Sequence, residues 1–276
     1  MVSFANSSMV PKLKLIWQEC FGDTSEYINF YYANRFRPEH TLVYLQECEP
    51  VAMLTLLPAE LMQGGVYHPI AYVYAVATMQ NQRGRGLSTK LLAYAKKWLT
   101  KNSVGTMVLA PEGEKLFEFY RKRGYTTAFK LKIAEFEATE QTQVGVTCKA
   151  ILPVEYKALR DAFFSGEGYL RWGIEAISYA LAENAQNGGF AVKIIIDNKE
   201  YAVLGSIKGD ILNIRETTLT NELICTALSY LARKNGCKKI VVASPANSTL
   251  EGTIRNMGMS DTPMQSTDGY MNLALD

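Results

Sequence analysis

The sequence is poor in residues that bind metal ions or form disulfides. Its 276 residues include only two histidines, His40 and His68, which are far apart in the sequence. The cysteines are scattered singly and odd in number: Cys20, Cys48, Cys148, Cys225 and Cys237. Neither the spacing of a zinc site nor a disulfide framework fits this pattern. We therefore expect no bound metal and a reducing, cytoplasmic location, with Cys225 buried on the apolar face of a helix.

An excess of charge of one sign is also missing. The chain has 29 basic and 27 acidic side chains, a formal net charge of +2. Surfaces that bind nucleic acids or anionic membranes need a larger positive excess, so neither partner is expected. No apolar run reaches the ~20 residues of a membrane span, and the first residues lack the pattern of a signal peptide. The chain does have 48% hydrophobic residues, enough for a sizeable core and about two domains.

The most informative segment is a turn that contains two glycines, Gly84 and Gly86. It follows a strand-like apolar run at residues 71–78 and precedes an amphipathic helix. Glycines let backbone amides approach a ligand closely, and a helix N-terminus offers unpaired N–H groups and the positive end of its dipole. Arg83 and Arg85 add positive charge at this point. The segment predicts a pyrophosphate site, and the simpler alternative is an ordinary turn before a helix.

Two common phosphate-binding loops do not match this turn. The P-loop needs four residues between its glycines, whereas one residue separates Gly84 from Gly86. The dinucleotide fingerprint needs a third glycine three residues after the second, where this chain has Thr89. Gly-x-Gly alone is a weak signal, so the surrounding sequence must decide what the turn binds.

The turn resembles the acyl-CoA pyrophosphate loop of the GNAT N-acetyltransferase superfamily. That loop reads Gln/Arg-x-x-Gly-x-Gly/Ala after a strand and at the start of a helix. The matching residues here are Asn81, Gly84 and Gly86. Asn81 departs from the family at the first position but keeps an amide side chain.

A second motif downstream resembles the same family. Tyr120, Gly124 and Tyr125 are similar to its Tyr-x-x-x-Gly-Phe/Tyr signature, in which a helix packs beside the cofactor. The family often has an asparagine near the start of this helix, where this chain has Gly113. The resemblance covers roughly residues 9–137.

The resemblance implies a reaction and a site. A substrate amine would attack the thioester of an acyl-CoA directly, with acetyl-CoA as the usual donor. Backbone groups of Val76 and Thr78 would bind the pantetheine arm, and Tyr120 would donate a proton to the leaving sulfur. The pyrophosphate would be bound by the turn and the start of the helix, at Arg83, Gly84, Arg85, Gly86, Leu87, Ser88 and Thr89.

Each of these residues also has a simpler interpretation. Val76 and Thr78 could be plain core strand residues, the arginines solvated charges, and Tyr120 a core tyrosine. A thiol has a reference pKa near 8.5, so its thiolate needs little help to leave, yet a phenol near the sulfur can still donate a proton. The general base is not identifiable: Glu60, Glu112 and Glu114 are candidates, and water is another.

The order of predicted elements fits the resemblance. Residues 1–8 are expected to form a loose tail, and the tyrosine-rich second helix would border the acceptor pocket in this family. The loop expected at residues 61–69 would contribute to specificity. Helices are predicted at residues 12–20, 25–35, from 87 onward and 114–123, and strands at 42–46, 51–57, 71–78 and 104–110.

The second half repeats this order after a polar linker predicted at residues 138–143. Its helices are predicted at residues 154–163, 169–185, 222–234 and 249–257, and its strands at 190–196, 201–207, 211–217, 239–243 and near 270–274. Where the first half has its glycine turn, the second has Leu219-Thr220-Asn221-Glu222, with no glycine or arginine. We predict an α/β (α+β) protein of two GNAT-like domains, each with a mixed, mostly antiparallel sheet flanked by helices.

The predicted domains are a catalytic acyl-CoA domain at residues 9–137 and a degenerate copy without the pyrophosphate loop at residues 144–276. This arrangement resembles the tandem acetyltransferases of the enhanced-intracellular-survival type. The leading hypothesis is an N-acetyltransferase that acts on a small-molecule or peptide amine. The alternatives are a non-catalytic acyl-CoA sensor or scaffold, and a domain that binds the phosphates of another nucleotide. The sequence specifies neither the acceptor nor the oligomeric state.

Overall fold

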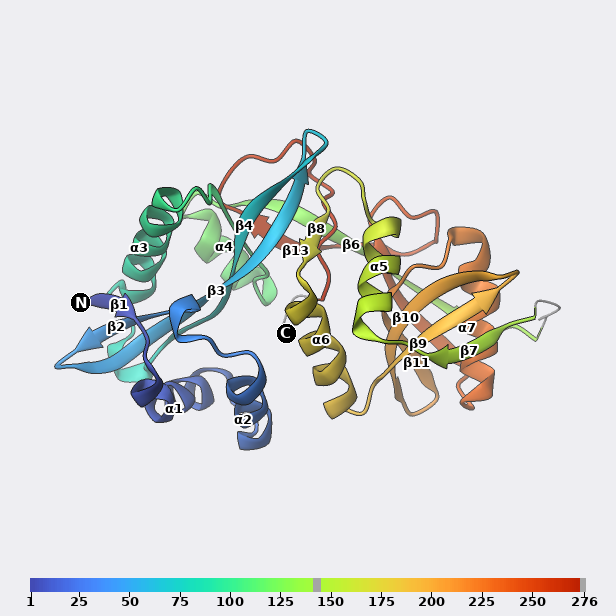
Figure 1. Ribbon diagram of the computed structural model, residues 1–276, viewed down its shortest axis with the longest axis horizontal. Coiled ribbons are helices and arrows are strands. Elements are labelled where there is room, and N and C mark those ends of the chain that lie inside the picture. Colours follow the sequence, from blue (N-terminus) through green and yellow to red (C-terminus); the bar gives the residue numbers. More distant parts are fainter. Residues whose placement is uncertain (141–144, 274–276) are drawn as a thin grey trace. The chain divides into compact units, whose positions relative to one another are not determined.

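The computed structural model describes residues 1–140 and 145–273 (Figure 1). The chain divides into two compact units. Unit 1 consists of Met1–Glu60, Tyr67–Thr126 and Met259–Pro263, and unit 2 of Leu61–Val66, Thr127–Gly258 and Met264–Asp276. Residues 141–143 of the predicted linker lie outside the described residues, so the boundary expected there stays a prediction.

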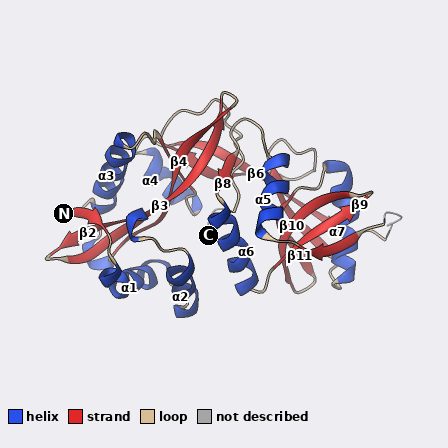
Figure 2. Cartoon of the chain, viewed as in Figure 1, coloured by secondary structure: helices blue, strands red, loops and turns tan. Residues whose placement is uncertain are grey.

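Unit 1 combines a mixed sheet with four α-helices (Figure 2). Its strands are hydrogen-bonded in the order β1-β2-β3-β4-β5. Its α-helices are α1 (Val10–Phe21), α2 (Ser25–Asn34), α3 (Leu87–Lys101) and α4 (Gly113–Arg121). Its strands are β1 (Val2–Phe4), β2 (Thr41–Gln46), β3 (Glu49–Gln63), β4 (Val66–Thr78) and β5 (Thr106–Leu109).

The core of unit 1 forms where α3 packs on the sheet. Leu87, Leu91 and Ala95 recur at four-residue spacing, so they lie on one face of the helix, and each is at most 5% exposed. They share one hydrophobic cluster with strand residues such as Leu54 and with Tyr120 of α4. This packing fixes the N-terminus of α3 relative to the end of the sheet.

Unit 2 has a second mixed sheet segment, in the order β6-β12-β11-β10-β9-β7, of which only β11 and β12 pair in parallel. Its α-helices are α5 (Pro153–Phe163), α6 (Ile174–Gln186) and α7 (Asn221–Lys234). Its strands are β6 (Thr126–Glu137), β7 (Thr147–Ala150), β8 (Leu170–Trp172), β9 (Phe190–Ile196), β10 (Lys199–Lys208), β11 (Ile211–Thr217), β12 (Lys239–Pro245) and β13 (Thr253–Ser260), whose last two residues belong to unit 1.

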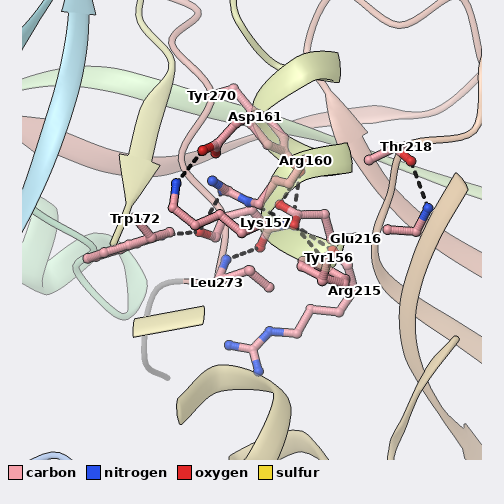
Figure 3. Close-up of polar contacts among 12 residues, drawn as sticks. Tyr156, Lys157, Arg160, Asp161, Trp172, Arg215, Glu216, Thr218, Tyr270 and Leu273 are labelled. Carbon is pink, nitrogen blue, oxygen red and sulfur yellow. Dashed lines mark hydrogen bonds and ion pairs between the residues drawn. The ribbon is translucent and has the colours of Figure 1, made fainter. Parts of the chain in front are cut away.

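A buried ion pair lies at the centre of unit 2 (Figure 3). Arg160 donates from Nε to the carboxylate of Glu216 at 2.9 Å, and both side chains are fully buried. The hydroxyls of Tyr156 and Tyr270 donate to the two oxygens of the same carboxylate, at 2.7 and 2.9 Å. These bonds satisfy the buried charge, which would otherwise be costly, and they hold the segment around Tyr270 against α5 and β11.

Several predicted elements were wrong, each because contacts distant in sequence decide the structure. Residues 249–257 do not form a helix but contribute to β13, whose Met259 and Ser260 pair with β5. The predicted helix at 169–185 begins as strand β8, and α6 starts only at Ile174. Leu170 donates its backbone N–H to the carbonyl of Tyr270, so this N–H takes part in strand-like and not helical hydrogen bonding.

Smaller corrections concern the termini, one loop and one cysteine. Val2–Phe4 forms β1 on the edge of the sheet, so residues 1–8 are not a loose tail. Residues 61–69 are not a loop, because β3 and β4 run up to a tight turn at Gly64 and Gly65. Cys225 is exposed. Near the predicted last strand, Tyr270 makes one isolated bridge with Tyr169, and residue 274 lies outside the described residues.

None of the helices in the described parts of the chain combines the length and apolarity needed to cross a membrane.

Candidate active site

The first feature of the site is the separation of β4 from β5. The two strands pair in parallel over Ile70–Tyr72 and Thr106–Val108, and β4 then continues to Thr78. β5 ends at Leu109, and its other edge pairs with β13 at Val108 and Leu109. Within the departing part of β4, Ala75 has a φ of +50°, which non-glycine residues adopt rarely. β4 therefore extends six residues beyond the part that pairs with β5.

Val76 and Thr78 lie in this departing part of β4, and both are half-buried. Val76 packs against the core of unit 1. The carbonyl of Thr78 accepts hydrogen bonds from Arg83 Nε at 3.2 Å and from the thiol of Cys20 at 3.3 Å. Both arginines are exposed to solvent, and Arg83 is folded back onto the end of β4.

The glycine turn has the backbone conformation that the sequence predicts for a close approach. Gly84 and Gly86 have φ angles of +78° and +70°, in the region that favours glycine. A Cβ built on either glycine meets no atom within 4 Å, so the surface above the turn is open. Gly86 is the N-cap of α3 and supplies no side-chain cap. The first amides of α3, at Leu87, Ser88 and Thr89, therefore form an uncapped helix N-terminus.

The second motif lies on α4 and the turn that follows it. Tyr120 is 6% exposed, and burial raises the pKa of its hydroxyl to about 12, while the charge of Arg123 acts in the opposite direction. Its ring packs edge-on against Tyr125, with centroids 5.5 Å apart. The hydroxyl of Tyr125 is buried and has no hydrogen-bond partner among the described residues.

Arg123 joins the two motifs, and the sequence analysis did not identify it. Its guanidinium donates to the hydroxyl of Thr89 from Nε at 3.0 Å and from a terminal nitrogen at 2.9 Å. The other terminal nitrogen donates to the carbonyl of Phe119 at 2.7 Å, and the guanidinium carbon lies 3.4 Å from the centroid of the Phe119 ring. The only signal in the sequence is its place just before Gly124, at the end of the second motif.

Aromatic side chains of α1 and α2 pack against β4. Trp17 packs on Tyr31 at a centroid distance of 4.5 Å and on Tyr74 of β4 at 5.7 Å. The Trp17 indole donates to Asp23 at 2.7 Å. Most of the tyrosines predicted on the second helix therefore take part in packing, and Tyr31 is 1% exposed.

The candidate bases lie at the start of α4 and in β3. Glu112 and Glu114 are exposed at the start of α4, and Glu114 pairs with Arg121 at 3.2 Å. Glu60 lies half-buried in β3. Within residues 1–140 and 145–273, no three His, Cys, Asp or Glu side chains gather where they could hold a metal ion.

Comparisons with known proteins bear on the identity of this site. Residues 2–128 match a family model described as an acetyltransferase (GNAT) domain, a span that contains both motifs. A search of curated protein sequences finds no significant match.

Solved structures extend the likeness to nearly the whole chain. It is similar to a GCN5-related N-acetyltransferase from Anabaena variabilis ATCC 29413, with a TM-score of 0.78 and 19% identity over 94% of this chain and 72% of that chain. A probable N-acyltransferase from Enterococcus faecalis V583 gives a TM-score of 0.74 and 16% identity over 94% of this chain and 72% of that chain. A tandem GNAT protein from the clavulanic acid biosynthesis pathway gives a TM-score of 0.56 and 14% identity, over 96% of this chain and 100% of that chain.

At these identities the solved structures show a shared fold, and the family model covers the residues that carry the two motifs. Residues 2–128 thus match the model of a GNAT acetyltransferase domain, and the chain has the mixed α/β fold of GNAT proteins.

Proposed function

We propose that the protein is an N-acyltransferase that transfers the acetyl group of acetyl-CoA to a primary amine of a small molecule or peptide. One observation carries the proposal: β4 departs from β5 and ends at an open glycine turn, where the uncapped N-terminus of α3 is bonded to the Tyr120 motif. The match of residues 2–128 to the acetyltransferase family supports it. The donor, the acceptor class and the residue roles are parts of the proposal.

The residues present fit an acyl-CoA. The open surface above Gly84 and Gly86 leaves room for a pyrophosphate at the amides from Gly84 to Thr89, where the helix dipole favours negative charge. Arg85 is exposed and free to approach a phosphate, whereas Arg83 would have to leave Thr78 to do so. Backbone groups of Val76 and Thr78 would bind the pantetheine arm. When bound, the cofactor supplies a thioester carbonyl for attack by the amine.

Tyr120 would act on the leaving sulfur as a hydrogen-bond donor. With its pKa raised to about 12, the hydroxyl stays protonated at neutral pH. A thiol has a reference pKa near 8.5, so complete transfer of the proton from the phenol to a thiolate is unfavourable. The hydroxyl therefore stabilises the developing negative charge on sulfur, and the proton that the thiolate finally takes comes from the attacking amine or from water.

Unit 2 is proposed to be a degenerate copy that does not bind acyl-CoA. Its α7 follows β11 as α3 follows β4 in unit 1. The N-terminus of α7 carries Glu222, which accepts a hydrogen bond from Thr220, in place of the glycine turn. A carboxylate here interacts favourably with the helix dipole and repels a pyrophosphate. The five free cysteines are the basis for proposing a reducing, cytoplasmic location.

The test is release of free CoA from acetyl-CoA in the presence of a panel of primary amines. We expect release that depends on the amine, saturates with acetyl-CoA and yields one acetylated amine per CoA. In parallel, CoA should raise the unfolding temperature because it binds the folded state. Absence of both effects would contradict the proposal and favour a domain for another phosphate ligand.

Binding of CoA without turnover across the panel would favour a non-catalytic sensor. One observation is in line with that alternative. Gly113 begins α4 with a φ of +73° and has no side chain to contact a ligand where the family often has asparagine. The buried tyrosine hydroxyl retained at position 120 favours turnover.

A further inference from the structure

Unit 2 contains a cavity of about 500 Å³ that lies entirely within that unit. It opens where β11 and β12 part: their parallel pairing covers Ile211–Ile214, after which β11 runs on to Thr217 and β12 to Pro245. Both strand ends and the first residues of α7 line the cavity. Its place in unit 2 corresponds, in element order, to that of the glycine turn in unit 1. The volume lies in the range of small-molecule sites.

One wall of the cavity is aromatic. Phe164 stacks on Tyr270 at a centroid distance of 4.1 Å and an interplanar angle of 22°, and Tyr169 lies 6.0 Å from Phe164. The hydroxyl of Tyr270 is bonded to Glu216, in the buried network of Figure 3, and does not line the cavity as a free donor. Donation to a carboxylate raises the electron density of a phenol ring, which strengthens its attraction for a cation.

Arg160 is a positive charge close to this aromatic wall. Its guanidinium lies 5.9 Å from the Phe164 ring and 5.0 Å from the Tyr169 ring. It is fully buried and paired with Glu216, so the pair adds no net charge to the wall. It therefore does not turn the cavity into an anion site.

The charged side chains of the cavity lining itself are two carboxylates, Glu222 and Asp268. Glu222 lines the cavity and is exposed. A hydrogen bond from the Thr220 side chain lowers the pKa of Glu222, so its carboxylate is ionised at neutral pH. Asp268, the other lining carboxylate, pairs with Lys130 at 2.8 Å. Among the described residues that line the cavity, none is lysine or arginine, and the other polar groups are hydroxyls and amides such as those of Ser244 and Asn247. Lys132, outside the lining, donates to the backbone carbonyl of Ser248.

We propose that this cavity is a second ligand site, which binds an organic cation with its ammonium group near Glu222 and its apolar body against the Phe164–Tyr270 stack. An aromatic wall with an unpaired carboxylate is the arrangement that binds organic ammonium ions. A phosphate ester is disfavoured because Glu222 occupies the helix N-terminus where a phosphate would bind. The proposal does not depend on acyl transfer by unit 1.

The test is calorimetric titration of the full chain with benzyltrimethylammonium, which has no N–H and cannot be acylated. We expect saturable binding that is unchanged by saturating CoA. Glu222→Gln should weaken binding at least about fivefold through loss of the charge. Glu175→Gln is the matched control, since Glu175 is an exposed glutamate in the first turn of α6 in the same unit and outside the cavity lining; its effect should stay within about twofold.

A neutral probe of the same shape, neopentylbenzene, should bind at least about tenfold more weakly than the ammonium. Equal binding of the two probes would overturn the cation preference. Unchanged affinity in Glu222→Gln, or displacement of the ammonium by CoA, would place the cation elsewhere and also overturn the proposal. So would the lack of saturable binding to the wild-type chain. None of these outcomes measures turnover, so they are distinct from a failure of the proposed acyl transfer.

Discussion

The guanidinium of Arg123 donates two hydrogen bonds to the hydroxyl of Thr89, at 3.0 and 2.9 Å. Thr89 lies in the first turn of α3, and Arg123 follows the end of α4. The two motifs that resemble a GNAT site are therefore bonded directly to each other. Because the bond joins the start of α3 to the turn after α4, it fixes the relative position of the two helices.

Removing this bond should affect donor binding more than turnover. We expect Arg123→Ala to raise the KM for acetyl-CoA about three- to tenfold, the effect of losing about 1 kcal/mol of positioning, with kcat changed less than about twofold. Steady-state kinetics at saturating amine measures both constants. Arg121→Ala is the control, because Arg121 pairs with Glu114 in an exposed ion pair and such pairs contribute little. Equal KM values for Arg123→Ala and the wild type would contradict the positioning role.

Two neighbouring tyrosines offer a matched test of the proposed chemistry. Tyr120→Phe should lower kcat about 10- to 100-fold and leave the KM for acetyl-CoA within about twofold, because only a hydrogen bond to the leaving sulfur is lost. Tyr125→Phe should leave kcat nearly unchanged, and it should preserve or slightly increase stability, because the buried Tyr125 hydroxyl has no hydrogen-bond partner in the described parts of the chain. Equal turnover in Tyr120→Phe and the wild type would remove Tyr120 from the mechanism.

A control glycine distinguishes the role of the glycine turn in CoA binding from the cost of backbone strain. Gly84→Ala and Gly86→Ala should each cost about 1 kcal/mol of stability, since an alanine is strained at a φ of +78° or +70°. Gly22→Ala should cost about the same, because Gly22 has a φ of +73° at the end of α1. Only the first two variants should also weaken CoA binding, measured by calorimetry. A similar loss of CoA binding in Gly22→Ala would mean that the loss comes from backbone strain and not from contacts of the glycine turn with CoA.

The stability of unit 1 should depend on a residue from the C-terminal part of the chain, Asp261. Asp261 accepts the backbone N–H of Met107 at 2.8 Å, and its other oxygen lies 2.7 Å from Lys96 Nζ. Asp261→Ala leaves that amide without its partner and should destabilise unit 1 by about 2 kcal/mol. Faster hydrogen exchange at the Met107 amide would report the change directly. Glu114→Ala breaks an exposed ion pair instead and should change stability by less than about 0.5 kcal/mol.

Stability should fall in strongly alkaline solution through the buried tyrosines. Burial raises the pKa of Tyr120 and of Tyr31 to about 12, above the ordinary value of 10.0. A raised folded-state pKa contributes stability that is fully present below pH 10 and is lost as the pH rises through about 12. The loss for Tyr120 is of the order of 3 kcal/mol. Chemical unfolding between pH 9 and pH 12 should therefore show a smaller alkaline loss in Tyr120→Phe, and an identical loss would contradict the pKa shift.

The sequence by itself determined the features that local pattern controls. The turn at Gly84 and Gly86 needs positive φ angles, and the four-residue spacing from Leu87 specifies the buried face of α3, so both follow from neighbouring residues. The place of Tyr120 on the second motif helix could be predicted for the same reason.

Only the tertiary structure decided the features that depend on distant pairing. Residues 253–260 form a strand because backbone groups of Met259 and Ser260 bond to β5. The periodicity of a segment does not report pairing with a distant strand. The bond from Arg123 to Thr89 and the cavity in unit 2 likewise join segments far apart in the chain. Helical periodicity reports which face of a segment is apolar, whereas strand pairing and cavities are set by what the fold brings alongside it.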